Sequence, residues 1–311
     1  MTSAALPPAS VTVRVPAKVN LELLVGAPRE DGYHPLSTVY HAVGLFDEVT
    51  VSVARRWGLT VTGPRSMGVP TDDGNLALRA ARQLAEAAGV EDPVHVAIRK
   101  DIPVAGGMAG GSADAAAALV ACDALWGLAM TRPELEGLAA ALGSDVPFLL
   151  SGGTAMGSGR GEVLAPVLAR GKFHWVLALS EGGLSTPAVY AECDRLRGRA
   201  PVADPVPTPE MMTALRSGDP RALAAALQND LQAAAISLLP ALGDVLEAGM
   251  EFGALGGIVS GSGPTVAFLA ESHEAALDLA ISLTASGAVQ DVRRATGPAH
   301  GAHVVGGPRA S

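Results

Sequence analysis

The sequence predicts an α+β protein built from two domains. Patterns of half-buried strands cluster in the first half of the chain, and helical patterns follow them, without a strict strand–helix alternation. With 311 residues, 49% of them hydrophobic, the chain is long enough to bury a core in each of two domains. A glycine-rich segment at 151–162 precedes a new strand pattern, so we expect domains at residues 1–165 and 166–311.

The expected elements of the first half are strands with helices between and after them. The strands show alternating, β-branched patterns, and they cover residues 11–15, 21–25, 49–53, 59–63 and 94–98. One helix is expected at 75–89, where apolar residues recur at helical spacing and the run ends in glycine. Two more are expected, one running to about Trp126 and one at 133–143.

The second half begins with a predicted strand at 173–180, and several helices follow. A proline-rich loop covers residues 197–209. A glycine-containing element at 256–269, a helix at 273–287 and a short strand near 289–294 complete this half. We find no internal repeat.

Composition and charge exclude several classes of protein. The net charge is −9, with the acidic residues scattered, which disfavours a general nucleic-acid or anionic-membrane binder. Cys122 and Cys193 lie in helical patterns without metal-ligand neighbours, so we expect buried free thiols rather than a disulfide or a zinc site. The first residues do not resemble a signal peptide, and no apolar run reaches the roughly 18 residues of a membrane span. We therefore expect a cytoplasmic protein.

The segment PVAGGMAGGSADAAAAL, residues 103–119, is typical of a phosphate site. Its glycines let backbone N–H groups turn toward a ligand, and the helix expected from about Ser112 directs its positive end to the same point. No Gly-Lys-Ser/Thr is present, which excludes a P-loop, and a dinucleotide fingerprint fits poorly. A flexible corner remains the alternative. Ser112 would donate to phosphate, bind Mg²⁺, or only cap its helix.

Three further segments have functional and purely structural interpretations. In PAKVNLELLVG (16–26), Lys18 and Asn20 are two residues apart on a strand, so their side chains share one face. In GSDVPFLLSGG (143–153), Asp145 lies at a helix-to-helix corner, where capping is the structural alternative. In GGIVSGSGPTVAFL (256–269), a second glycine–serine turn has a tight hairpin as its alternative.

Residues 16–26, 103–119 and 259–269 resemble the three motifs of the GHMP kinase superfamily of small-molecule kinases, in the same order and separations. Segments 29–49, 143–162, 184–190 and 228–235 resemble the branch that acts on a cytidine diphosphate alcohol. The resemblance extends over roughly residues 11 to 295. It implies an N-terminal domain like ribosomal protein S5 domain 2, a C-terminal ferredoxin-like domain, and a substrate cleft between them.

The resemblance implies ATP-dependent phosphorylation of the 2-hydroxyl of a cytidine diphosphate methylerythritol, in non-mevalonate isoprenoid biosynthesis. Lys18 and Asp145 are the implied catalytic pair. Phosphoryl transfer needs a proton acceptor and positive charge near the reacting oxygens. Asp145 would accept the hydroxyl proton, and Lys18 would keep Asp145 ionised and orient the hydroxyl.

The resemblance also implies substrate contacts. Asn20 would bind near the reacting hydroxyl, beside Asp145, and Tyr33 and His34 would bind cytosine. Tyr190 would stack on the other side of the base, with Thr186 nearby. The family favours phenylalanine at the position of Tyr190, so this chain departs from the pattern but keeps the aromatic ring.

An ATP site is implied along the glycine loop and its flanks. Its expected residues are Asn75, Leu76, Lys100, Pro103, Val104, Ala105, Gly106, Gly107, Met108, Ala109, Gly110, Gly111 and Ser112. The family more often reads Leu-Gly-Gly-Gly-Ser-Ser-Asp here, so Ala109 and Ala113 are departures. We expect Ala109 to avoid a strongly positive φ, Ser112 to supply the hydroxyl for phosphate or Mg²⁺, and Asp114 to cap the helix.

Other functions remain open at this point. A homoserine or mevalonate-pathway kinase would share the lysine, the glycine loop and the third motif, but it has no cytosine to bind. A non-catalytic nucleotide or sugar sensor would not need a proton acceptor. A hydrolase is disfavoured because no G-x-S-x-G is present. We expect a monomer or homodimer that binds ATP, Mg²⁺ and a small-molecule substrate, and neither nucleic acid nor membrane.

Overall fold

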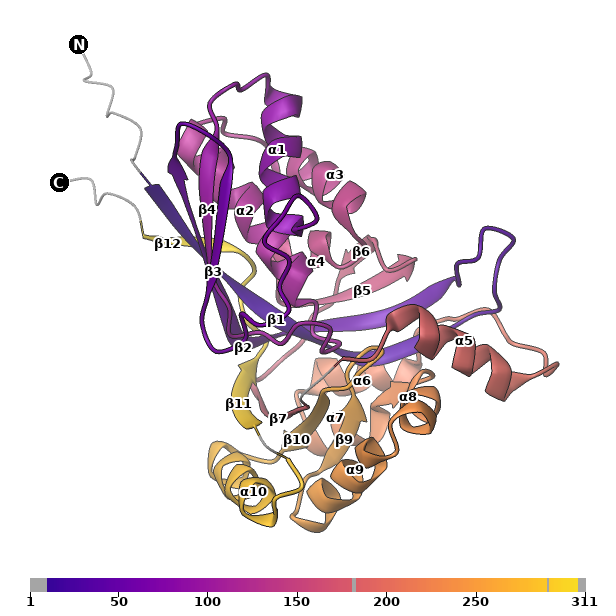
Figure 1. Ribbon diagram of the computed structural model, residues 1–311. Coiled ribbons are helices and arrows are strands. Elements are labelled where there is room, and N and C mark those ends of the chain that lie inside the picture. Colours follow the sequence, from indigo (N-terminus) through magenta and orange to yellow (C-terminus); the bar gives the residue numbers. More distant parts are fainter. Residues whose placement is uncertain (1–9, 181–182, 290, 307–311) are drawn as a thin grey trace.

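The computed structural model describes residues 10–180, 183–289 and 291–306, which form two β-sheets and ten helices (Figure 1). In the larger sheet the strand order is β12-β1-β2-β4-β3, with β5 paired to β2 and β6, and β8 paired to β1. Its strands are β1 (Ser10–Val25), β2 (Leu36–Val53), β3 (Gly58–Thr62), β4 (Val94–Arg99), β5 (Thr154–Gly159), β6 (Val163–Pro166), β8 (Gln228–Asn229) and β12 (His303–Gly306).

A long antiparallel hairpin of β1 and β2 is the centre of the larger sheet. The prediction of two short strands at 11–15 and 21–25 is wrong, because β1 is continuous through Pro16. The pairing register shifts between Pro16 and Ala17 and again between Asn20 and Glu22. Such bulges re-aim side chains without ending a strand. The predicted strand at 49–53 is only the last part of β2.

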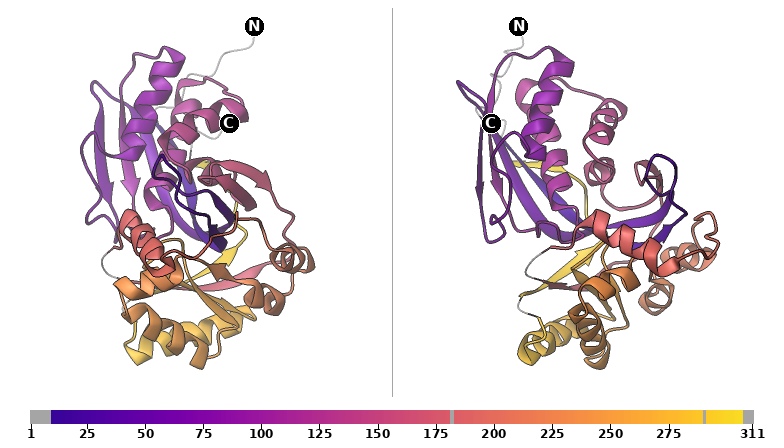
Figure 2. Two further views of the ribbon diagram at one scale, coloured as in Figure 1. Left: turned by 90° about the vertical axis from the view of Figure 1, so that its right-hand side faces the viewer. Right: turned by 45° about the vertical axis from the view of Figure 1, so that its right-hand side comes forward.

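Helices α1 (Leu76–Ala88), α2 (Gly110–Trp126), α3 (Arg132–Leu142) and α4 (Val146–Ser151) lie on one side of this sheet (Figure 2). The alanine-rich helix α2 packs against β1 and β2 on one side and against the other three helices on the other. Residues 113–119 are all buried. Small side chains allow this close approach on every side, which explains why the segment has no polar face.

The smaller sheet contains β7 (Phe173–Leu179), β9 (Gly256–Val259), β10 (Val266–Ala270) and β11 (Asp291–Gly297), in the order β11-β7-β10-β9. All its neighbouring strands are antiparallel. This is the sheet order of a ferredoxin-like domain, as predicted. Its helices are α5 (Thr186–Arg197), α6 (Pro209–Ser217), α7 (Pro220–Ala226), α8 (Gln232–Leu238), α9 (Ala241–Glu251) and α10 (His273–Ser286). Gln290, within the strand predicted near 289–294, lies outside the described residues.

Strand β7 shows how the two domains are joined. Because side chains alternate along a strand, Trp175, Leu177 and Leu179 enter the core shared with the larger sheet, whereas Val176 and Ala178 face the helices of the second domain. The smaller sheet is therefore covered on both faces.

The chain also returns to the larger sheet after residue 165. Strand β8 pairs in parallel with β1, and β12 pairs with β1 in the antiparallel sense. A division at residue 165 therefore does not separate the two sheets.

No single helix within the described ranges is long and apolar enough to cross a membrane. Helices α8 and α9 pass that test only as a pair, and a bend of 119° separates them.

Candidate active site

The two domains enclose a cavity of about 610 Å³ beside the β1–β2 hairpin. It brings together side chains and backbone from both halves of the chain. Of the residues singled out in the sequence, it is lined by Lys18, Asn20, Tyr33, His34, Ala105, Gly107, Ala109, Ser112, Asp145, Thr186 and Tyr190. The remaining members of the expected ATP site, with Lys100 among them, lie outside this lining.

Lys18 and Asp145 form an ion pair in the cavity, with 3.6 Å between Lys18 Nζ and Asp145 Oδ2. Lys18 lies on β1 and is only 5% exposed. Asp145 precedes α4, but its side chain makes no capping hydrogen bond, so the capping alternative is not supported. A buried ammonium beside a half-exposed carboxylate is a suitable arrangement for activating a hydroxyl.

Asn20 fixes the position of the lysine. As expected from their spacing, the two side chains share one face of β1, and Lys18 Nζ donates to Asn20 Oδ1 at 2.6 Å. Asn20 Nδ2 donates to the Thr38 hydroxyl at 2.8 Å, and that hydroxyl donates to the Glu22 carbonyl at 2.7 Å. This chain of hydrogen bonds crosses from β1 to β2 and back, so it holds the ammonium in one place.

The glycine loop joins β4 to α2 in a tightly turned conformation. Helix α2 begins at Gly110, before the expected start at Ser112, and Ala109 at its N-cap supplies no capping side chain. The expectation that Ala109 avoids a positive φ is wrong: φ is 60° there and 51° at Ala105. The first N–H groups of α2 therefore have no side-chain partner, which suits an anionic ligand.

The third motif holds the glycine loop from the other domain. Strands β9 and β10 form the hairpin expected as the structural alternative. Its turn also contacts the glycine loop: Ser260 Oγ donates to the Gly107 carbonyl at 3.0 Å, and Thr265 N donates to the Gly106 carbonyl at 3.3 Å. The Met108 carbonyl accepts from Lys18 N at 3.3 Å, so the same loop is tied to β1 as well.

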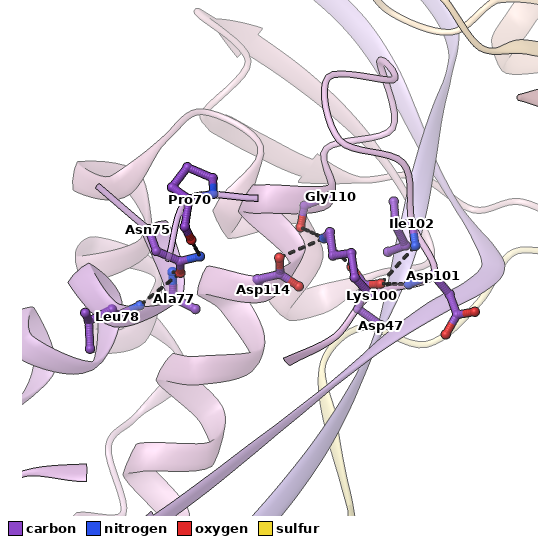
Figure 3. A network of polar contacts seen from close by, with 10 residues as sticks. All are labelled: Asp47, Pro70, Asn75, Ala77, Leu78, Lys100, Asp101, Ile102, Gly110 and Asp114. Carbon is purple, nitrogen blue, oxygen red and sulfur yellow. Dashed lines mark hydrogen bonds and ion pairs between the residues drawn. The ribbon is translucent and has the colours of Figure 1, made fainter. Parts of the chain in front are cut away.

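Lys100 lies inside the protein, which corrects its expected place beside adenosine. It is 1% exposed, and its ammonium donates to Asp47, to Asp114 Oδ2 at 2.7 Å and to the Gly110 carbonyl at 2.9 Å (Figure 3). All three protons are thus used within the protein. Asp114 is not a helix cap, because it lies inside α2 and faces Lys100. Burial raises the pKa of Asp114 to about 8, against the opposing effect of Lys100.

Asn75 and Leu76 stand at the start of α1. Asn75 is the N-cap of this helix: its Oδ1 accepts from the backbone N–H groups of Ala77 and Leu78, and its Nδ2 donates to the Pro70 carbonyl (Figure 3). These contacts use the amide oxygen and one of the two N–H groups of the amide nitrogen. The capping role therefore accounts for most of the Asn75 side chain, and one N–H is left for a ligand.

His34, Tyr190 and Tyr33 also line the cavity. The His34 and Tyr190 rings are 5.1 Å apart at 41°. His34 is buried, and its Nε2 lies 3.0 Å from Asp194 Oδ1. Tyr33 is 54% exposed, and the Arg160 guanidinium lies 5.1 Å from its ring centroid.

Sequence reasoning missed several residues that line the cavity, among them Tyr40, Arg160 and Asp194. A signal for Asp194 is its helical spacing from Thr186 and Tyr190, at intervals of four residues along α5. Arg160 lies in segment 143–162, which contributed to the family resemblance and to the expected domain boundary, but only Asp145 was singled out there as a site residue.

Comparisons with known proteins define the class of this fold and site. The family model described as GHMP kinases N terminal domain matches residues 75–153, and the one described as GHMP kinases C terminal matches residues 211–288. The chain belongs to the GHMP kinase family.

Relatives with a more specific name span nearly the whole chain. A protein of Mycolicibacterium smegmatis is 58% identical over 307 residues, with 97% of this chain and 94% of the relative covered. One of Streptomyces avermitilis is 56% identical over 296 residues, with 95% and 100% covered. Both are named 4-diphosphocytidyl-2-C-methyl-D-erythritol kinase.

Solved structures agree in fold. A crystal structure of 4-(cytidine 5'-diphospho)-2C-methyl-D-erythritol kinase has a TM-score of 0.75 and 35% identity, with 91% of this chain and 98% of that chain covered. Homoserine kinase from Cytophaga hutchinsonii also has a TM-score of 0.75, at 19% identity and with 98% and 99% covered, a likeness of fold alone.

Proposed function

We propose that this chain transfers the γ-phosphoryl group of ATP to the 2-hydroxyl of 4-diphosphocytidyl-2-C-methyl-D-erythritol, giving the 2-phosphate and ADP. The step belongs to non-mevalonate isoprenoid biosynthesis. The observation that carries the proposal is the Lys18–Asp145 pair in a cavity shared with the glycine loop and with His34 and Tyr190. The names of near-full-length relatives support the choice of acceptor.

The catalytic residues have distinct roles in this proposal. The acceptor hydroxyl binds beside Asp145, which takes its proton as the hydroxyl oxygen attacks the γ-phosphorus. The bond from this phosphorus to the bridging oxygen breaks, and ADP leaves with that oxygen. Lys18 pairs with Asp145, and its positive charge lies where negative charge develops in the transition state.

ATP and Mg²⁺ fit the residues present. The uncapped start of α2 and the glycine loop offer backbone N–H groups to the phosphates. Mg²⁺ usually takes few protein ligands together with substrate phosphates, so the absence of a three-residue His, Cys, Asp or Glu cluster among the described residues does not conflict with it. Ser112 lines the cavity beside the glycine loop. Its hydroxyl would hold the ion, which neutralises phosphate charge when bound.

The part of the cavity lined by His34 and Tyr190 suits a pyrimidine base. His34 and Tyr190 supply two rings close enough to contact one base, and Asp194 fixes the histidine ring through its Nε2. Thr186 is held by a 2.9 Å hydrogen bond to Ser262, and both residues line the cavity. Homoserine and mevalonate contain no base that could bind there.

An ADP-release assay tests the proposal, with the cytidine diphosphate methylerythritol, homoserine and mevalonate offered separately. We expect ADP only with the first. ADP formed only with homoserine or mevalonate would overturn the choice of acceptor. Nucleotide binding without ADP formation from any of them would instead favour a sensor.

A further inference from the structure

We propose that Tyr40 is a positioning residue of the phosphoryl transfer, with its hydroxyl holding the Asp145 carboxylate in the orientation that accepts the substrate proton. This inference rests on the proposed function. It assigns a role to a tyrosine on β2 and to the glycine-rich hairpin of β5 and β6.

The two oxygens of the Asp145 carboxylate have different partners. Tyr40 donates to Asp145 Oδ1 at 3.0 Å, while Oδ2 faces Lys18 at 3.6 Å. A carboxylate held on both sides loses its freedom to rotate, so the oxygen beside Lys18 stays directed into the cavity. The Lys18 ammonium also lies 5.7 Å from the centre of the Tyr40 ring.

The tyrosine can only donate in this position. It is 3% exposed, and burial, followed by the nearby Asp145 charge, raises the pKa of Tyr40 well above its ordinary value. The phenol therefore stays protonated at neutral pH. Its ring is fixed by stacking on Phe148 of α4, with centroids 5.0 Å apart at 26°.

Two glycines make room for this side chain. A Cβ at Gly161 would come within 2.2 Å of the Tyr40 hydroxyl, and a Cβ at Gly157 within 2.7 Å of its ring. Without the hydroxyl, the nearest Tyr40 atom to a Cβ at Gly161 would be 3.4 Å away, an ordinary contact. The glycines of the β5–β6 hairpin therefore leave room for the Tyr40 ring and its hydroxyl.

Tyr40→Phe removes the hydroxyl and keeps the stacked ring. Hydrogen bonds to charged groups contribute enough that we expect single-turnover phosphoryl transfer, with enzyme in excess, to slow by about 10- to 100-fold. The KM values for both substrates should stay within about twofold. In an Asp145→Asn background the same substitution should cause no further loss, because the carboxylate it positions is gone. Thr12→Val, which removes a hydroxyl bonded to Thr50 elsewhere on the sheet, is the control and should leave the rate unchanged.

Tyr40→Phe turning over like the unmodified enzyme, or losing the same factor with and without Asp145, would overturn the inference. No transfer by the unmodified enzyme would instead refute the proposed function.

Discussion

Ser260 Oγ donates to the Gly107 carbonyl at 3.0 Å, and this bond joins the C-terminal domain to the glycine loop. The two backbones approach so closely that a Cβ at Gly107 would come within 2.0 Å of the Ser260 carbonyl oxygen. Gly107 also has a φ of 74°, in the left-handed region that favours glycine. The nucleotide end of the cavity is therefore held from both domains.

Gly107→Ala is expected to abolish most activity. The added methyl group must push the glycine loop away from Ser260, because a backbone atom cannot rotate aside. We expect KM for ATP to rise at least tenfold and the melting temperature to fall, both measured on purified protein. Gly137→Ala is the matched control: Gly137 lies in α3 with no atom within 4 Å of the added Cβ, so stability should rise by about 0.5–1 kcal/mol. Equal behaviour of the two variants would contradict this role of Gly107.

Lys100→Met is expected to cost about 3–5 kcal/mol of unfolding free energy, because it leaves the Asp47 and Asp114 carboxylates buried without their cation. Asp114→Asn keeps an oxygen for Lys100 and leaves Asp47 as its ion-pair partner, so its cost should stay below about 1.5 kcal/mol. Chemical denaturation measures both. A milder effect of Lys100→Met than of Asp114→Asn would show that the ammonium does not hold this site together.

Arg160→Gln is expected to weaken acceptor binding about tenfold. Arg160 and Lys18 supply basic side chains of the cavity lining, and the Arg160 guanidinium lies 5.1 Å from the centroid of the Tyr33 ring. KM for the cytidine diphosphate alcohol should rise while KM for ATP changes less than twofold. Arg29→Gln, which breaks an exposed pair with Asp31, is the control. An increase confined to KM for ATP would contradict a role of Arg160 in binding the acceptor.

His41 should make the fold sensitive to acid. Burial lowers the pKa of His41 to about 3, against an ordinary value of 6.5. Between these two pH values the unfolded chain binds a proton that the folded chain does not, so the free energy of unfolding falls as the pH falls. The contribution is at most about 1.4 kcal/mol per pH unit. His41→Gln should reduce the slope between pH 6 and 4 by up to that amount. An unchanged slope in denaturation curves would refute this.

Helices α1, α2, α3 and α10 and strand β7 could be predicted from the sequence because their signals are local. Helix α1 is amphipathic and ends in Gly89, and β7 is a short apolar run, so both were expected within one or two residues of their bounds. For the hairpin of β1 and β2 the sequence predicted only separate short strands, because Pro16 and the polar residues of β2 interrupt the strand pattern. Both strands are largely buried, so no regular alternation marks them.

Site residues that lie in family motifs could be predicted from the sequence. Residues whose role depends on partners from distant parts of the chain could not. Lys18 and Asp145 are 127 residues apart, yet both were found through the family motifs. Lys100 was placed wrongly because its partners Asp47 and Asp114 come from β2 and α2, and no local pattern links them. Tyr40 and Arg160 were missed because their positions depend on how the β5–β6 hairpin folds onto β2.

The most direct test of the account is the single-turnover rate of phosphoryl transfer in Lys18→Ala and in Asp145→Asn. Each folded variant should react about 100- to 10,000-fold more slowly than the unmodified enzyme, because the proton acceptor or the charge beside it is missing. Lys172→Ala, at an exposed lysine outside the cavity lining, should react at the normal rate. A rate within about tenfold of normal in either of the first two variants would contradict the account.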